Sequence, residues 1–452
     1  MSQVKLFSSS GGARVAKRSG RQKKQKVKKP LKTLAIWLLV ILCLEGLYFF
    51  CIYTNNSFVK KWRTIYINTA MDTMRHQWLA TYFIPKDVID EVRYEYGLVK
   101  AGTVGKESTW GRTDPVPADQ TPSTSNDNIV TLDPNVTHET DQPDSEELTQ
   151  EALAKQAEEN FYSVFWELDR TSMETYLAEH PDTLANGWEH IYINEAGFDD
   201  EGTSIQSTFG EQVLAIDAYN GVLLLRISGK GYRGVLAVGK DPSRLSIEMA
   251  TTLGTAGQLS GTIAEAHNGV LAMNANGFLD PNGAGNGGLL AGYTMSNGKA
   301  YGDHFSAYAY KRIELHEDDL FYIKDALSPV SEDCTDAAEF TPALIVDGKK
   351  IMDDYWTGEQ PRACIGQSEK YEILMLVIEG RYPLEGILGT SVNNCSEILL
   401  QHKCMQAINL DGGSSAMLWF DGEYVTQSSS SPLRYTGGRP LPNAWVYKKA
   451  ES

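Results

Sequence analysis

Residues 405–417 read MQAINLDGGSSAM, an apolar run that passes directly into one carboxylate, two glycines and two hydroxyls. The run follows a predicted helix over 393–404, and its composition is that of a buried strand. Asp411 comes at the carboxyl end of this strand, where a strand delivers a side chain to the mouth of a pocket. The stretch therefore predicts a strand-based domain with a polar site where the strand ends.

The four residues after Asp411 suit two different structures. Gly412 and Gly413 permit positive φ and a close approach of the backbone to a ligand. Ser414 and Ser415 add hydroxyl and backbone donors. Together they predict a cradle for an anion or a sugar beside a carboxylate, whereas the plain alternative is a hairpin with a glycine turn.

Similar short apolar runs, separated by Gly, Asn and Asp, recur through the C-terminal part of the chain. Asn-Gly at 220–221 and Asp-Gly at 347–348 are strong hairpin signals. Helices are expected there near 247–267 and 393–404. We therefore expect an α+β fold, a mixed β-sheet domain with a few packed helices, over residues 188–452.

Charge separates the chain into a basic start and an acidic body. Residues 1–33 contain eleven Lys and Arg and no Asp or Glu, whereas the whole chain of 452 residues has a net charge of -17. The rest holds 30 of the 41 basic residues and all 58 acidic residues, a net charge of -28. Because nucleic-acid phosphates select basic surfaces, we set nucleic acid aside as a partner.

The boundary between the two charge regimes is residues 34–53, LAIWLLVILCLEGLYFFCIY, in which Glu45 is the one residue expected to be charged. Twenty helical residues span about 30 Å, the thickness of a bilayer's hydrocarbon core. This pattern predicts a single transmembrane helix, with a buried helix or a cleaved signal peptide as the alternatives. Because positive charge stays inside, we expect a cell-membrane protein with a cytoplasmic tail at 1–33 and an extracytoplasmic C-terminal domain.

Composition predicts three further segments between the anchor and the domain. Residues 54–100 mix apolar, basic and aromatic side chains and are expected to form a juxtamembrane helical stalk. Residues 101–150 are rich in Thr, Ser, Pro, Asp and Gly, which predicts a disordered linker. Residues 151–187 show helical periodicity, with Phe161 and Phe165 on one face.

Four cysteines, Cys334, Cys364, Cys395 and Cys404, follow the predicted linker. An even number in an oxidising compartment permits two disulfides, and buried free thiols are the alternative. If Cys395 and Cys404 share one helix, about 13 Å separates them, which is too far for a disulfide. No cluster has metal-ligand spacing, so neither a metal nor a cofactor is expected, with a divalent cation bound by Asp411 as the alternative.

Polar groups also border other predicted strands, in NANGF at 274–278, PRACIG at 361–366, IEGR at 378–381 and GGRPLPNA at 437–444. Three arginines in an acidic domain suit a phosphate, which a guanidinium binds in a bidentate manner. For each arginine alone, a surface salt bridge is the plain alternative. The substrate-binding candidates are Asn274, Asn276, Gly277, Arg362, Arg381, Gly412, Gly413, Ser414, Ser415, Arg439 and Asn443.

With NLDGGSSAM at 409–417 these stretches make five motifs, in the order NANGF, PRACIG, EGR, NLDGGSSAM and GRPLPNA. In this order they resemble the phosphodiester glycosidase family over about residues 205–448. Arg362 stands where the family has an Arg before a small-x-Gly sequence. Arg381 matches the Arg of the family's Asp-Gly-Arg motif, and Asp411 matches the Asp of its Asp-Gly-Gly motif. The anchored arrangement resembles bacterial members of the exopolysaccharide-biosynthesis type.

The chain also departs from the family pattern. Asn276 and Gly277 match the family's Asn-Gly-Gly-Phe, but Phe278 replaces its second glycine. Glu379 stands where Asp is usual, and Ser414 where many members have a third glycine.

The resemblance implies hydrolysis of a sugar 1-phosphodiester between the anomeric carbon and its oxygen, in a cell-surface or exported glycan. Asp411 is then the base or nucleophile and Glu379 the second carboxylate, while the arginines stabilise the phosphate leaving group. The expected partners are a glycan or sugar phosphate, the membrane and components of polysaccharide assembly. Two rival functions remain open: a non-catalytic phosphoglycan-binding module and an assembly factor for exopolysaccharide export.

Overall fold

The computed structural model forms two compact units, Met1–Lys60 and Lys61–Ser452, which are described separately. The described residues are 29–72, 77–111, 150–197, 201–281, 285–305, 310–351, 358–429 and 438–451. Most of the predicted cytoplasmic tail and of the predicted linker therefore lies outside the described residues.

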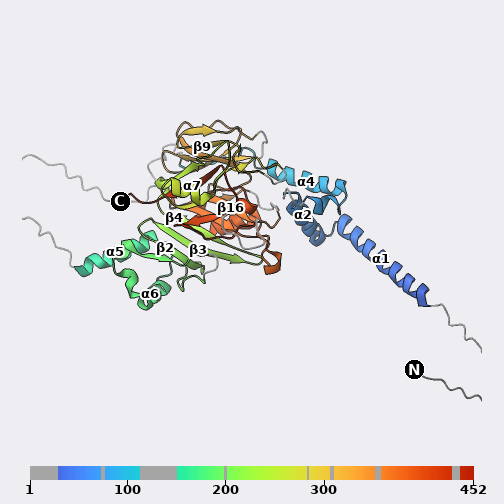
Figure 1. Cartoon of the computed structure of the whole chain (residues 1–452), viewed down its shortest axis with the longest axis horizontal. Coiled ribbons are helices and arrows are strands. Elements are labelled where there is room, and N and C mark those ends of the chain that lie inside the picture. Colours follow the sequence, from blue (N-terminus) through green and yellow to red (C-terminus); the bar gives the residue numbers. More distant parts are fainter. Residues whose placement is uncertain are drawn as a thin grey trace, which may run out of the picture. The chain divides into compact units, whose positions relative to one another are not determined.

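The first unit contains helix α1, Lys29–Tyr53, drawn in blue in Figure 1. Its segment Thr33–Tyr53 is long and apolar enough to cross a membrane, with a mean hydropathy of 2.4. Nearly all of its side chains are exposed. A signal sequence near the N-terminus has the same length and composition, so the transmembrane helix stays a prediction.

Three helices follow: α2 (Ser57–Met71), α3 (Trp78–Thr81) and α4 (Lys86–Ala101). Within the second unit, Ile67 of α2 and Val92 of α4 are buried. Arg93 of α4 forms an ion pair of 2.7 Å with Asp72, directly after α2. Helical structure is thus present in the segment that the sequence assigned to a stalk.

Residues 102–111 are hydrogen-bonded to the sheet domain. The backbone N–H of Ser108 donates to the Ile323 carbonyl at 2.8 Å, and the Ile323 N–H donates to the Ser108 hydroxyl at 2.8 Å. Ser108 is buried by this exchange. The linker predicted for 101–150 can therefore begin only after residue 111.

Two helices precede the sheets, α5 (Gln150–Val164) and α6 (Arg170–Glu179). Phe161 and Phe165 are buried on one side of α5, as the helical periodicity predicts. The Asp169 carboxylate caps α6 by accepting from the Ser172 N–H at 2.8 Å. Two 3-10 turns follow at Pro181–Leu184 and Trp188–His190.

In the described part of the chain, the largest sheet has nine antiparallel strands in the order β1-β2-β3-β4-β17-β16-β18-β14-β15. Its central β17, ILMLVI, is buried along its whole length, as expected for a strand covered on both faces. In chain order the strands are β1 (Tyr192–Asn194), β2 (Gln212–Asp217), β3 (Val222–Gly229), β4 (Tyr232–Gly239), β14 (Ala343–Val346), β15 (Lys349–Lys350), β16 (Arg362–Ser368), β17 (Ile373–Ile378) and β18 (Cys404–Asn409).

Two five-stranded sheets, again counted over the described ranges, have the orders β10-β9-β13-β11-β12 and β20-β19-β6-β21-β5. The rings of Phe321 in β12 and Trp445 in β21 meet at 5.5 Å and join these sheets in one core. Their strands are β5 (Leu245–Met249), β6 (Gly269–Asn274), β9 (Thr294–Ser296), β10 (Lys299–Tyr301), β11 (Lys311–His316), β12 (Phe321–Asp325), β13 (Cys334–Phe340), β19 (Leu418–Phe420), β20 (Glu423–Tyr424) and β21 (Asn443–Lys448). A short pair consists of β7 (Gly277–Phe278) and β8 (Leu290–Ala291).

Few helices pack on these sheets, so the predicted α+β class is confirmed (Figure 1). The helix α8, Val392–Gln401, overlaps the range 393–404 expected for it and ends three residues earlier, and both predicted hairpins form, β2-β3 and β14-β15. The helix expected over 247–267 is wrong in its first half, because β5 pairs with β21 there. Only α7, Ser260–Ala266, is helical in that range.

The four cysteines of the domain, Cys334, Cys364, Cys395 and Cys404, are buried free thiols. Cys404 begins β18 and lies outside α8. The distance argument that assumed one shared helix for Cys395 and Cys404 therefore does not apply.

Deleting residues 113–144 should leave the melting temperature of the protein nearly unchanged, because this stretch has few apolar side chains that could join a core. In contrast, Ser108→Ala removes the acceptor of the Ile323 N–H and should cost about 1–3 kcal/mol. Thermal and urea unfolding of both variants would check this. A large destabilisation by the deletion, or none by Ser108→Ala, would contradict the boundary at residue 111.

Candidate functional site

The pairing of β18 with β16 determines where Asp411 lies. Just beyond β18, the N–H of Leu410 donates to the Ala363 carbonyl at 2.8 Å. The next residue, Asp411, leaves the ladder beside the first residue of β16, Arg362. The strand end expected from the sequence is therefore present, and it brings a carboxylate next to a strand that starts with a guanidinium.

The two glycines after Asp411 serve different purposes. Gly413 has φ +62°, and a Cβ added there would lie 2.9 Å from Nη1 of Arg381. Gly412 has φ −98°, which any residue adopts, but a Cβ would lie 2.5 Å from the Pro361 carbonyl oxygen. Of these two glycines, only Gly413 therefore has a positive φ. Gly412 is needed because its backbone lies too close to the Pro361 carbonyl for a side chain to fit.

The Asp411 carboxylate is surrounded by groups of both signs. Burial raises its pKa above the ordinary value of 3.8, and a hydrogen bond from the Ser415 side chain lowers it. Arg439 and Arg381 lower the pKa further, whereas Asp280 raises it. The net direction is upward, so Asp411 binds a proton more readily than an exposed aspartate.

Arg362 and Arg381 bring two guanidinium groups close together. Burial lowers the pKa of Arg381, repulsion from Arg362 lowers it further, and Asp411 opposes both. Arg362 is oriented by the carbonyls of Thr390 at 3.1 Å and Gly358 at 3.0 Å. Arg381 has φ +67°, an uncommon conformation for a non-glycine residue that is concentrated at functional sites.

Arg439 comes from the segment before β21. It forms an ion pair of 2.6 Å with Asp280 and donates to the Gly285 carbonyl at 3.0 Å. Its guanidinium lies 4.5 Å from the centre of the Phe278 ring. Phe278, which replaces a glycine of the family motif, therefore supports this arginine through a cation–π contact.

Of the three predicted asparagines, Asn276 and Asn443 bond to each other, and Asn274 bonds to Asp411. The Asn276 N–H donates to Asn443 Oδ1 at 3.1 Å, and Asn276 Nδ2 donates to the Tyr293 carbonyl. Asn274 Nδ2 donates to the backbone carbonyl of Asp411 at 2.7 Å. The buried Oδ1 of Asn274 has no hydrogen-bond partner among the described residues.

Two further candidates have less direct placements. Gly277 begins β7, where a Cβ would lie 3.2 Å from the Phe340 ring, so it is required for packing. Ser414 is partly exposed in the 3-10 turn Gly413–Ser415. Both keep their predicted binding role as predictions only.

Glu379 is engaged with other partners. Its Oε2 accepts from Arg233 Nε at 2.7 Å and its Oε1 from the Gln427 N–H at 2.8 Å. Burial raises its pKa and Arg233 lowers it. Because Ile378 pairs with Arg362, the alternation along β17 points Glu379 to the opposite face of the sheet. Its role as second carboxylate stays a prediction, and these contacts favour a structural one.

A histidine that sequence reasoning missed lies beside the asparagines. His304 Nδ1 is 2.5 Å from Oε1 of the fully buried Glu339, whose Oε2 accepts from the N–H groups of Tyr293 and Phe305. The His304 ring stacks on Tyr293 at 4.4 Å, and the Tyr293 carbonyl accepts from Asn276. A carboxylate that orients one imidazole nitrogen leaves the other for proton transfer.

The helices before residue 102 also reach this region. Burial lowers the pKa of Lys100, Asp72 opposes that shift, and Arg362 adds to it. A Cβ on Gly358 would overlap Thr69 of α2, so α2 packs directly on the segment that leads to β16. No local signal in residues 54–100 predicts this contact, because it depends on pairing between segments far apart in the chain.

Comparison with known proteins assigns a family to part of the chain. The family model described as phosphodiester glycosidase matches residues 267–448, which confirms the resemblance carried by the five motifs for that part. No curated protein matches the chain.

Three solved structures are similar to it. The zebrafish N-acetylglucosamine-1-phosphodiester alpha-N-acetylglucosaminidase catalytic domain, auto-inhibited by its pro-peptide, has 15% identity and a TM-score of 0.41, over 51% of this chain and 82% of that chain. A hypothetical protein from Synechocystis has 15% identity and a TM-score of 0.36, over 54% and 65%. A putative exported protein from Burkholderia pseudomallei has 13% identity and a TM-score of 0.35, over 48% and 74%.

Asp411→Asn should leave the protein at least as stable as the wild type at neutral pH. Because its pKa is raised in the folded protein, ionised Asp411 lowers the free energy of unfolding. This loss of stability is absent at pH values below the unfolded-state pKa and reaches its full size above the folded-state pKa. Asn is neutral throughout, so its advantage should shrink as the pH falls toward 3.8. Urea unfolding at several pH values would check this, and a large loss of stability at neutral pH would contradict it.

Proposed function

We propose that this chain is a membrane-anchored, extracytoplasmic phosphodiester glycosidase that hydrolyses a sugar 1-phosphodiester in a cell-surface or exported glycan. The family match of residues 267–448 supports the reaction class. The observation that carries the proposal is Asp411: Arg439 and Arg381 both lower the pKa of its carboxyl group, and its backbone carbonyl accepts from the Asn274 amide at 2.7 Å. The apolar segment Thr33–Tyr53 supports the anchor.

The arginines account for phosphate recognition. Burial lowers the pKa of Arg381 and repulsion from Arg362 lowers it further, and a phosphate bound between the two guanidinium groups would relieve that repulsion. Both side chains are positioned by their surroundings, Arg362 by two carbonyls and Arg381 by Gly413. Groups fixed before the reaction stabilise developing charge most effectively, because they need not reorganise during the step.

In the proposed reaction, a water oxygen bonds to the anomeric carbon and the bond from that carbon to the phosphoryl oxygen breaks. The electron pair leaves with the phosphate monoester, whose charge the guanidinium groups stabilise. Asp411 either accepts the proton of the attacking water or first bonds to the carbon as the nucleophile and expels the phosphate, after which water attacks the same carbon, breaks its bond to Asp411 and restores the carboxylate. The Asn274 Oδ1 is placed to accept a hydrogen bond from a sugar hydroxyl.

The second proton-transfer group has two candidates. Glu379 is committed to Arg233 and to the Gln427 N–H. His304 is held through Nδ1 by Glu339, so its Nε2 is the nitrogen that would exchange a proton. We therefore add His304 to Glu379 as the candidate acid or base.

Substitutions in the purified full-length protein would test the catalytic assignments. Asp411→Asn should lower kcat/KM for a sugar 1-phosphodiester by at least about a thousandfold, and His304→Gln by about a hundredfold with a changed pH profile. Glu379→Gln should lower kcat/KM far less than Asp411→Asn does, because Glu379 is engaged with Arg233 and the Gln427 N–H. Asp421→Asn, in the β19-β20 turn, serves as the matched control.

The measurement is the release of free sugar from a panel of sugar 1-phosphodiesters, together with binding of the same compounds. Equal turnover by wild type and Asp411→Asn would refute the catalytic assignment. Binding without turnover by the wild type would favour the phosphoglycan-binding module. Neither binding nor turnover on any compound would favour the assembly factor for exopolysaccharide export.

The proposed orientation predicts that protease added to intact cells removes the chain after residue 54. The reason is the eleven basic residues of 1–33, which should hold the N-terminus in the cytoplasm. Immunoblotting for tags at both ends would detect the change, with a cytoplasmic protein as the control for intact cells. Full protection of the C-terminal tag would contradict this topology.

A further inference from the structure

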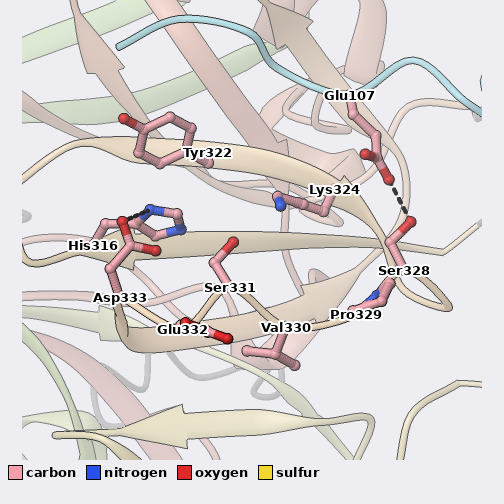
Figure 2. A pocket seen from close by; sticks show the side chains of 10 residues that line it. All are labelled: Glu107, His316, Tyr322, Lys324, Ser328, Pro329, Val330, Ser331, Glu332 and Asp333. Atoms are coloured by element: carbon pink, nitrogen blue, oxygen red, sulfur yellow. Dashed lines mark hydrogen bonds and ion pairs between the residues drawn. The ribbon is translucent and has the colours of Figure 1, made fainter. Parts of the chain in front are cut away.

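A second polar cavity lies among residues that play no part in the Asp411 site. Figure 2 shows it between β11, β12 and the loop before β13. Its volume is about 470 Å³, within the range of small-molecule pockets. Glu107, from the segment 102–111, also contributes to its lining.

Lys324 is the unusual residue of this cavity. Its side chain is only 8% exposed, and its ammonium makes no hydrogen bond or ion pair with any described residue. In Figure 2 its amine extends into the cavity, on the same side as Tyr322, His316 and Ser331. The strand register places another cation, Arg312, directly across from Lys324. An ammonium that faces a cavity without a carboxylate partner is free to pair with an anionic ligand.

The nearby carboxylates already have other donors. Glu314 accepts from Arg312 at 2.7 Å and from His316 at 2.9 Å. Glu107 Oε1 accepts from the Ser328 hydroxyl at 2.5 Å and from the Asp325 N–H at 3.0 Å. The walls are therefore held in place by internal hydrogen bonds, and the Lys324 ammonium is left for a ligand.

The geometry points to a binding site for a small sugar acid, such as a hexuronic acid unit, whose carboxylate would pair with Lys324. The exposed carboxylates Glu332 and Asp333 border the same cavity and accept hydrogen bonds, which suits sugar hydroxyls. With Glu107 they make three carboxylates around one lysine, so a singly charged carboxylate is repelled less there than a phosphate dianion. A neutral sugar would leave the Lys324 ammonium without an ionic partner. This inference does not depend on the proposed hydrolysis.

Binding to the full-length protein in detergent tests the site, with sodium D-glucuronate as the probe and glucose and inorganic phosphate as comparisons. Glucuronate should raise the melting temperature and give a calorimetric binding signal, whereas glucose should give neither and phosphate should bind more weakly. Lys324→Met should lower the glucuronate affinity by at least about tenfold. Lys299→Met, at an exposed lysine of the same sheet, should leave it unchanged.

Two further variants make the outcome unambiguous. Val330→Trp should block binding by filling the cavity, and it replaces Lys324→Met if that variant fails to fold. Asp411→Asn should bind glucuronate as well as wild type does, which separates this site from the proposed active site. The inference is overturned if glucuronate does not bind, if phosphate binds equally well, or if Lys324→Met and Val330→Trp bind it unchanged.

Discussion

The register between β16 and β18 is the constraint on which the candidate site depends. The ladder places Leu410 opposite Ala363, so that Asp411 emerges beside Arg362. A slip of one residue would send every side chain of β18 to the other face of the sheet. It would separate the carboxylate from the guanidinium groups and bury polar side chains in the apolar core. The register is therefore fixed by the hydrophobic pattern of the buried strands, and the site depends on that packing.

The sheet formed by β9 to β13 is polar in its interior. Arg312 binds Glu314 at 2.7 Å and approaches Glu339 at 3.5 Å, and both glutamates are fully buried. His316 extends the chain of contacts at one end and His304 at the other. Buried ion pairs add little net stability relative to apolar packing, although breaking one is costly. The network is thus better explained by what it positions, which is His304 against Tyr293, whose carbonyl accepts from Asn276, and His316 in the wall of the second cavity.

Sequence reasoning recovered the features that are encoded locally. Asp411 follows an apolar run whose burial the composition shows directly, and the Asp347-Gly348 hairpin has a two-residue signature. It could not distinguish Gly412 from Gly413, because which glycine takes positive φ depends on the position of the Arg381 guanidinium. The helix expected over 247–267 failed for a related reason, since β21, almost two hundred residues later, recruits Ile247 into a strand.

His304 and Glu339 were missed for a further reason. Glu339 sits in a strand of alternating small and polar residues, which by pattern alone has a solvated face. In the fold that face is covered, and the carboxylate is completely buried. A single sequence does not reveal which polar face of a strand becomes covered, because the answer depends on how the sheets pack. The pairing of His304 with Glu339 therefore becomes visible only in three dimensions.

The polar groups that have no hydrogen-bond partner differ in their charge and in their surroundings. Several are neutral single atoms, such as Trp445 Nε1 and Tyr162 Oη, and each costs a modest amount of stability. Asn274 Oδ1 differs because its own amide is fixed to the backbone of Asp411, so the orphan acceptor belongs to the candidate site. Lys324 differs because it carries a full charge and opens into a cavity. A full charge that faces space for a ligand without an ionic partner is the stronger argument for binding.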